Sequence, residues 1–269
     1  MEKILLKYNQ SAEEEKAKKL AAGPLGKELS SFPLLFAKPA FFGQRPSPKR
    51  TTEVRNGTIA LIDLGKGPMG LTCQHVIKGY REYREKYEGV LFNISNVELD
   101  PIDQLIDENE KFDLASIQLS DKQITAITSV GKIGSFVYKP SSWPPTPPKV
   151  NEFVSFGGFP GSLRTVMSFD EIVFSSWSSG ASRVDSVGEY RFISPFEREY
   201  WIKSFGEVHH MNLHALGGMS GSPAFVSRGL SFEFVGVLSD YEKNYDAVFF
   251  ASVQSVNPDG KITSEQPET

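Results

Sequence analysis

The sequence predicts an all-β protein, a sandwich or a barrel, preceded by a partly helical N-terminal extension. Short runs rich in β-branched and aromatic residues, each bounded by turn residues, follow one another from residue 58 to residue 253. Few long helical periods separate them. A chain of 269 residues, 39% of them hydrophobic, is long enough to bury a sizeable core. We therefore expect a globular protein with one large domain or two small ones.

Residues 1–55 are expected to form the extension, a short helix followed by an irregular segment. Ser11 followed by Glu14 is a capping-box pattern, and the good helix formers behind it end at Gly23. A short helix is therefore predicted over residues 11–22. The chain is then apolar and interrupted by prolines as far as residue 42, and afterwards polar, basic and rich in turn residues.

A proline-rich segment, residues 139–150, divides the β-rich body into residues 56–138 and residues 151–269. Prolines cannot extend a strand ladder and favour a stiff, extended connection. The β-prone runs of the first part are residues 58–64, 71–76, 89–99, 113–119, 124–130 and 134–139. Those of the second part are residues 153–159, 171–177, 190–194, 222–227, 232–238 and 247–253. A helical pattern, GYREYREKY, follows the run at 71–76.

Charge and cysteine content exclude some partners and locations. The 29 Lys and Arg against 33 Asp and Glu give a net charge of −4, which disfavours non-specific nucleic-acid binding. The single cysteine, Cys73, cannot form an internal disulfide, which favours a reducing compartment. There is no signal-peptide pattern, and no stretch approaches the roughly 18 apolar residues of a membrane span. We expect a cytoplasmic protein.

The segment Gly217–Phe225, GGMSGSPAF, is the first candidate for chemistry. Glycines on both sides of Ser220, Gly218 and Gly221, let backbone N–H groups converge as an oxyanion hole requires. A serine also needs a base to take its proton. His75 is the candidate, because it lies between a β-prone run and a helical pattern, where side chains reach a cleft.

Asp113, directly before the alternating pattern of a strand, is the candidate that orients the imidazole of His75. The other histidines are His209, His210 and His214. They lie beside β-prone sequence with no cysteine or acidic ligand at a recognised spacing, so we predict no metal site. Cys73 is expected to be a small buried thiol.

The motifs TCQHV, FDLASIQL and GGMSGSP, in that order, resemble the His, Asp and Ser motifs of trypsin-like (chymotrypsin-fold) serine proteases. GGFPG at 157–161 and FVGVL at 234–238 resemble the disulfide-free bacterial branch that includes the glutamyl endopeptidases and the HtrA-type proteases. The resemblance covers roughly residues 56–256. It implies two packed, antiparallel, six-stranded β-barrels with a cleft between them.

The resemblance also implies a role for each motif residue. Ser220 attacks the peptide carbonyl, His75 acts as general base and then general acid, and Asp113 fixes the imidazole tautomer. The N–H groups of Gly218 and Ser220 hold the oxyanion. The implied activity is that of a serine endopeptidase acting on protein or peptide, without metal or cofactor.

Some residues depart from the pattern of these proteases. Met219 replaces the aspartate that trypsin-type enzymes pair with a new N-terminus, so that mode of activation is not expected. His214, Leu238 and Ser239 are expected to border the substrate pocket. Leu238 stands where glutamyl endopeptidases have a histidine, which argues against glutamate specificity.

Three other interpretations of the motifs differ in how well the residues fit them. An α/β-hydrolase needs a glycine at the position of Ser222 and a histidine after the nucleophile, and this chain has neither. A subtilisin-like order, Asp63, His75 and Ser220, has a short connection between the first two for an α/β unit, and it stays a remote alternative. A protein of the protease fold that is inactive or conditionally active, and that binds extended peptides, stays open.

Overall fold

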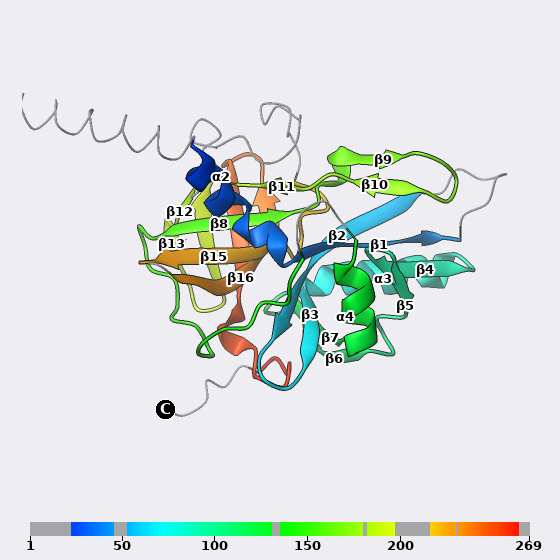
Figure 1. Cartoon of the computed structure of the whole chain (residues 1–269), viewed down its shortest axis with the longest axis horizontal. Helices are drawn as coiled ribbons and strands as arrows, with labels where there is room; N and C mark the ends of the chain where they lie inside the picture. The colour runs from blue at the N-terminus through cyan, green and yellow to red at the C-terminus, as the bar shows by residue number, and fades with distance from the viewer. Residues whose placement is uncertain are drawn as a thin grey trace, which may run out of the picture.

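The structure, a computed structural model, describes residues 23–45, 53–130, 135–179, 182–196, 216–229 and 231–263. The described residues form two curled antiparallel sheets with helices packed around them (Figure 1). The prediction of an all-β fold with two barrels is confirmed, but the two sheets have seven and eight strands within the described residues in place of the six expected for each. The helix predicted over residues 11–22 lies outside the described residues. Among the helices that the structure describes, none is long and apolar enough to cross a membrane.

The first sheet has, within the described residues, seven strands in the order β5-β4-β1-β2-β3-β7-β6. They are β1 (Ala37–Gln44), β2 (Val54–Asp63), β3 (Pro68–Thr72), β4 (Val90–Ile94), β5 (Val97–Leu99), β6 (Leu105–Asn109) and β7 (Leu114–Gln118). Helices α3 (Gln74–Lys86) and α4 (Asp121–Thr128) share a hydrophobic cluster with this sheet. Ile77, Tyr80 and Tyr83 recur at helical spacing on α3, so that one face of the helix is buried.

Strand β1 corrects the expectation of an irregular segment before residue 56. Residues Ala37–Gln44 pair with both β2 and β4, inside the first sheet. Pro39 interrupts the apolar pattern, and a proline cannot donate to a ladder. The ladder with β4 begins only at Ala40, however, and Pro39 faces Thr58 of β2 on the other side. Its missing N–H therefore leaves the pairing with β4 intact.

Helix α4 corrects the prediction of a strand over residues 124–130. The run is rich in β-branched residues, which favour strands. Ser120 and Gln123 form a capping box in which the Ser120 hydroxyl accepts from the N–H of Gln123 at 3.3 Å. This cap starts a helix, and the buried Ile127 anchors it on the first sheet. The helical pattern after His75 is confirmed as α3.

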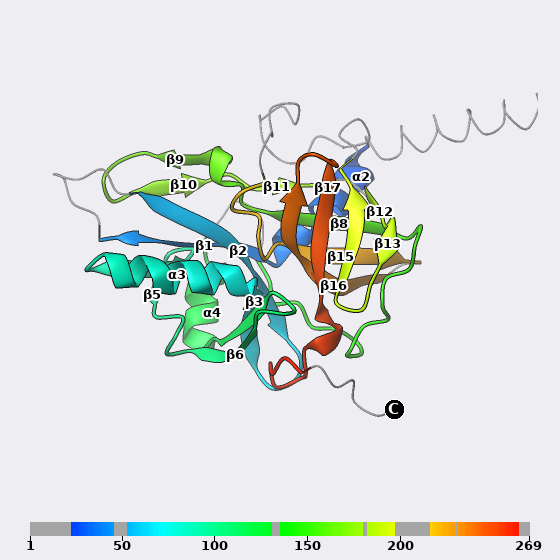
Figure 2. The same ribbon diagram turned by 180° about the vertical axis from the view of Figure 1, so that it is seen from behind.

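The second sheet, in the part of the chain that the structure describes, has eight strands. Seven follow the order β11-β8-β15-β16-β17-β14-β13, and β12 pairs with β8. They are β8 (Phe153–Gly158), β11 (Trp177–Ser178), β12 (Ser182–Arg183), β13 (Ser186–Val187), β14 (Arg191–Pro195), β15 (Pro223–Arg228), β16 (Ser231–Glu242) and β17 (Ala247–Ser252). Large aromatic side chains, Phe156, Trp177, Phe192 and Phe250, fill its interior. A separate hairpin, β9 (Arg164–Val166) and β10 (Ile172–Phe174), lies beside β1 and β2 (Figure 2).

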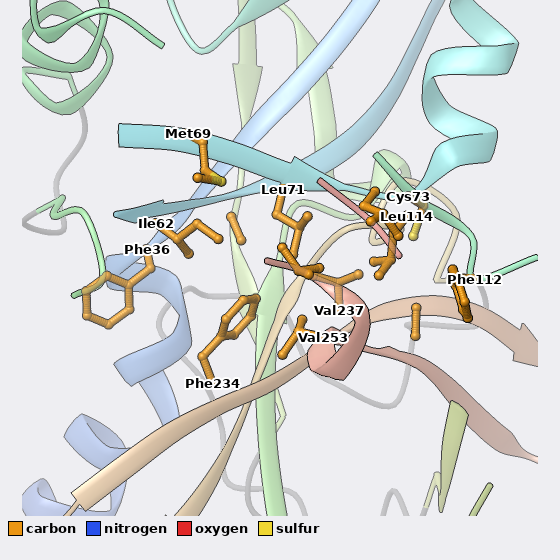
Figure 3. Packing of buried hydrophobic residues seen from close by; sticks show 14 of the residues in the cluster. Phe36, Ile62, Met69, Leu71, Cys73, Phe112, Leu114, Phe234, Val237 and Val253 are labelled. Atoms are coloured by element: carbon orange, nitrogen blue, oxygen red, sulfur yellow. The ribbon is translucent and has the colours of Figure 1, made fainter. Parts of the chain in front are cut away.

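A hydrophobic cluster joins the two sheets (Figure 3). Leu71 and Leu114 reach it from β3 and β7, and Phe234 and Val237 reach it from β16. All four side chains are fully buried. Burial of side chains of this size contributes about 1.5–3 kcal/mol each, so this contact holds the two halves of the body together without a disulfide.

The described part of the N-terminal extension packs across the second sheet before the chain enters the first. Helix α2 (Pro24–Ser31) leads into the 3₁₀ helix η1 (Phe32–Leu35). The ring of Phe32 stacks on Phe232 with centroids 4.3 Å apart and meets Phe225 edge-on at 5.1 Å. Residues 32–36 are thus part of the core packing.

The proline-rich segment is held against the second sheet by Arg228 of β15. The guanidinium donates to the carbonyls of Thr146 and Pro147, each at 3.0 Å, and pairs with Glu152 at 2.8 Å. Hydrogen bonding to Arg228 holds the pKa of Glu152 below its ordinary value. The segment is therefore a packed connection between the two sheets.

The burial of Lys38 on β1 is expected to make the stability of the protein depend on pH. Its side chain is 5% exposed and Nζ donates to the carbonyl of Val130 at 2.8 Å. Burial lowers its pKa from 10.5 to about 8, so the unfolded chain binds more protons than the folded one between these values. Compared with Lys38→Met, the wild type should therefore gain stability as pH rises from about 8 to 10.5, by on the order of 3 kcal/mol.

The measurement is the free energy of unfolding of both proteins by denaturant at several pH values, with Lys122→Met on the exposed face of α4 as the matched control. A stability gap between the wild type and Lys38→Met that stays constant across this pH range contradicts the prediction.

Candidate active site

His75 and Asp113 come from the ends of two neighbouring strands. β3 ends at Thr72, and His75 lies in the first turn of α3, which begins two residues later. Asp113 directly precedes β7, whose residue Ala115 is the pairing partner of Thr72. The pairing of β3 with β7 therefore brings the two side chains together.

The Asp113 carboxylate binds both the ring and the backbone of His75. Nδ1 of the imidazole lies 2.9 Å from Oδ2 and 3.0 Å from Oδ1, and the His75 N–H donates to Oδ1 at 3.1 Å. The Asp113 side chain is 13% exposed and the imidazole 47%. An ionised carboxylate only accepts hydrogen bonds, so Nδ1 carries the ring proton. The Nε2 lone pair is left free to accept a proton.

Ser220 lies in a tight loop, residues 217–221, that only glycines allow. φ is +92° at both Gly218 and Gly221, a region that L-residues with a side chain rarely adopt. A Cβ at position 221 would also lie 1.9 Å from the carbonyl oxygen of Thr58. The two glycines that flank Ser220 in the sequence are therefore required by the shape of the loop.

Thr58 of β2 fixes this loop from the other sheet. Its N–H donates to the carbonyl of Ser220 at 2.8 Å and its hydroxyl donates to the carbonyl of Gly218 at 3.0 Å. Gly161 adds a third bond, from its N–H to the carbonyl of Gly217 at 2.7 Å. Sequence reasoning missed Thr58, and no local signal marks it, because its role exists only where the two sheets meet.

Two backbone N–H groups of the loop are available to an outside acceptor. Within the described residues, the N–H groups of Gly218 and Ser220 donate to no protein atom, whereas that of Met219 donates to Leu216 at 2.9 Å. Two N–H groups of one loop can stabilise a negatively charged oxygen when both donate to it. Those of Gly218 and Ser220 are the two N–H groups that the sequence motif predicts for an oxyanion hole.

His75, Asp113 and Ser220 line one cavity of about 570 Å³. Among the described residues, no hydrogen bond joins the Ser220 hydroxyl to the imidazole. Such contacts are often long in free enzymes and shorten when substrate binds. The other residues that line the cavity are Arg191, Leu216, Gly217, Leu238, Ser239, Asp240, Tyr241 and Lys243.

Leu238 and Ser239, two of the predicted pocket residues, lie on this cavity. The carbonyl of Leu238 accepts the N–H of Gly221 at 2.8 Å, and the Ser239 hydroxyl donates to the carbonyl of Phe249 at 3.2 Å. The polar groups of both residues thus brace the cavity wall. The structure does not describe His209, His210 or His214.

Cys73 lies behind the cavity wall, two residues before His75. Its side chain is fully buried, and Sγ donates to the carbonyl of Leu238 at 3.1 Å. Burial, and secondarily the charge of Asp113, raise the pKa of the Cys73 thiol well above its ordinary value. The donor atoms of Cys73, His75 and Asp113 all lie within 4.8 Å of one another.

Asp63, the acid of the subtilisin-like alternative, has a different position. It closes the β2–β3 turn, where its carboxylate accepts the N–H groups of Gly65 and Gly67 at 2.9 and 3.2 Å and pairs with Lys139 at 3.1 Å. His75 instead pairs with Asp113. The subtilisin-like alternative is therefore wrong.

Comparison with known proteins finds likenesses of fold at low sequence identity. No family model matches the sequence, and no curated protein matches it. Similar solved structures include an active-form protease of M. tuberculosis, at TM-score 0.44 and 13% identity over 92% of this chain and 90% of that chain. The tobacco etch virus protease has TM-score 0.43 and 15% identity, over 80% of this chain and 73% of its own. A thermostable serine protease from an extremophilic microorganism has TM-score 0.42 and 11% identity, over 81% and 91%. Likenesses of this size transfer no activity.

Proposed function

We propose that this protein is a serine endopeptidase whose catalytic residues are Ser220, His75 and Asp113. The observation that carries the proposal is the hydrogen-bonded pair of His75 and Asp113 on the same cavity as Ser220. The available N–H groups of the Ser220 loop support it, because acyl transfer needs an oxyanion hole. The substrate of this proposed activity is a protein or peptide, whose amide carbonyl is the reacting group.

In the proposed reaction, Ser220 Oγ attacks the peptide carbonyl carbon while Nε2 of His75 takes its proton. The oxyanion that forms accepts from the N–H groups of Gly218 and Ser220. The Asp113 carboxylate stabilises the imidazolium, which then gives its proton to the departing amine. Water repeats the sequence on the acyl-enzyme and releases the carboxylic acid product.

The nucleophile of the proposal is Ser220 and not the single cysteine of the chain. A cysteine is strongly nucleophilic only as the thiolate and not as the neutral thiol. The raised pKa of the buried Cys73 keeps its thiol neutral. Cys73 also does not line the cavity, whereas Ser220 does. A substrate carbonyl in the cavity would therefore meet the hydroxyl of Ser220.

A second candidate function is peptide binding without turnover, or with turnover only after a conformational change. It is favoured by one observation: in the part of the chain that the structure describes, the Ser220 hydroxyl has no hydrogen bond to His75. Such a protein would hold an extended peptide along the cavity by strand addition.

A fluorophosphonate probe distinguishes the two, because it reacts only with a serine activated by its base. We expect stoichiometric labelling of the wild type and of Ser168→Ala, a control on the exposed turn after β9, and no labelling of Ser220→Ala. Mass spectrometry of the labelled peptide identifies the modified serine. A folded wild type that stays unlabelled would overturn the endopeptidase proposal and leave peptide binding.

A further inference from the structure

We propose that Cys73, His75 and Asp113 form a binding site for a thiophilic divalent cation of the Zn²⁺ class, and that its occupation blocks the catalytic base. The blocking rests on the proposed function; the binding does not. The three side chains offer a thiolate sulfur, an imidazole nitrogen and a carboxylate oxygen, which are the ligand types that Zn²⁺ takes in proteins.

The backbone brings the three ligands together without rearrangement of the fold. Cys73 is the N-cap of α3 and His75 lies two residues further on, so one helix start supplies two ligands. Asp113 directly precedes the neighbouring strand β7. Figure 3 shows Cys73 beside Leu114, the residue that follows Asp113. The donor atoms already lie within 4.8 Å of one another. A cation between them would lie at the roughly 2.0–2.3 Å of zinc bonds once side-chain rotation draws the three donor atoms closer together.

The charges of the site suit a divalent cation. A thiolate and a carboxylate together neutralise a charge of +2, so that the occupied site is neutral where Cys73 is fully buried. Two hydrogen bonds would be replaced by metal bonds: that of Sγ to Leu238 and that of Nδ1 to Asp113. The thiol proton leaves to solvent, because a coordinated thiol is deprotonated outright.

The site also has an open fourth position. His75 and Asp113 line the cavity of Ser220, whereas Cys73 lies behind its wall. A cation held by the three would therefore face the cavity on one side and keep a water there. Three protein ligands and one exchangeable position give four-coordinate geometry.

Occupation would remove the base by changing the imidazole tautomer. In the free protein the ring proton is on Nδ1, facing Asp113, and Nε2 can accept a proton. A cation on Nδ1 takes that position, so the neutral ring carries its proton on Nε2 instead. Nε2 then has no lone pair for the hydroxyl proton of Ser220, and acyl transfer stops.

The test uses Cd²⁺ as the probe, because a cadmium–thiolate bond gives a charge-transfer absorption in the ultraviolet. Cys73 is the only cysteine of the chain, so the absorption reports this residue alone. We expect it to saturate at one Cd²⁺ per wild-type chain, with release of one proton, and to be absent in Cys73→Ser. In His75→Ala and in Asp113→Asn the affinity should fall by at least the roughly 10–100-fold that loss of outer-shell partners costs.

Two controls separate this site from other metal contacts. Asp240→Asn changes a carboxylate on the same cavity but outside the cluster, and it should bind Cd²⁺ as the wild type does. A His209→Ala, His210→Ala double variant should also retain the absorption. The rate of fluorophosphonate labelling of the wild type should fall in proportion to the fraction of sites that hold Cd²⁺. The labelling rate of Cys73→Ser should be the same with and without Cd²⁺.

Two outcomes overturn the site itself: no absorption in the folded wild type, or equal affinity in His75→Ala, which would mean that the thiol binds alone. Full occupancy without loss of labelling overturns the block of the base. A wild type that is never labelled but shows the absorption overturns the proposed function and supports the metal site, so the two failures are distinguishable.

Discussion

A Ser220→Ala, His75→Ala double variant is expected to be no slower than either single variant, and all three should lose about a millionfold in kcat on a peptide substrate. The reason is that the two side chains act as one unit. A hydroxyl without its base is not deprotonated, and a base without the hydroxyl has no proton to take. Once either is missing, only binding and the oxyanion hole remain, and these still give about 10³–10⁴-fold over the uncatalysed reaction.

The measurement is steady-state hydrolysis of a fluorogenic peptide by the wild type, both single variants and the double variant, each checked for folding by circular dichroism. Ser168→Ala is the matched control and should hydrolyse peptide at the wild-type rate. Losses that multiply in the double variant would mean that Ser220 and His75 act independently, which contradicts the proposed mechanism.

The loop that carries Ser220 could be predicted from the sequence because glycines mark it. Gly218 and Gly221 are needed for backbone conformations at φ +92°, and such positions leave a clear trace in the sequence. The short strands of the two sheets are visible for a similar reason, since turn residues bound them. These features depend on residues that are close together in the sequence, and such features can be predicted from a single sequence.

Features that depend on distant contacts could not be predicted. Strand β1 was missed because Pro39 reads as a break, and only the pairing shows that β4 begins its ladder one residue later. Helix α4 was missed because its β-branched residues outweighed the capping box at Ser120. In both cases the outcome was set by neighbours that a linear pattern does not contain.

The same limit applies to the site. Nothing in the sequence around Thr58 predicts that its N–H and hydroxyl bind the Ser220 loop of the other sheet. The nearness of the Cys73 sulfur to the Asp113 carboxylate also follows from the pairing of β3 with β7 and not from spacing along the chain. Residues that shape the candidate site from outside the motifs are visible only in three dimensions.

Asp113→Asn is expected to lower kcat by about 10⁴-fold near neutral pH. The amide can donate a hydrogen bond to Nδ1, which would place the ring proton on Nε2, where the imidazole is no longer a base for Ser220. An amide also cannot stabilise the imidazolium that forms during the reaction. Both effects act on the chemical step, so KM should change little.

This variant is suited to separating catalysis from folding. Asp113 has φ +53°, and asparagine is among the residues that tolerate this left-handed region. The Asn Oδ1 can still accept the backbone N–H of His75, a bond of 3.1 Å in the wild type. The free energy of unfolding should therefore change far less than kcat. Asp170→Asn, which changes an exposed carboxylate on the turn after β9, is the control and should keep kcat at the wild-type value. A loss below about tenfold in Asp113→Asn would show that its carboxylate does not serve His75 in catalysis, and the assignment of Asp113 as the orienting residue would have to be withdrawn.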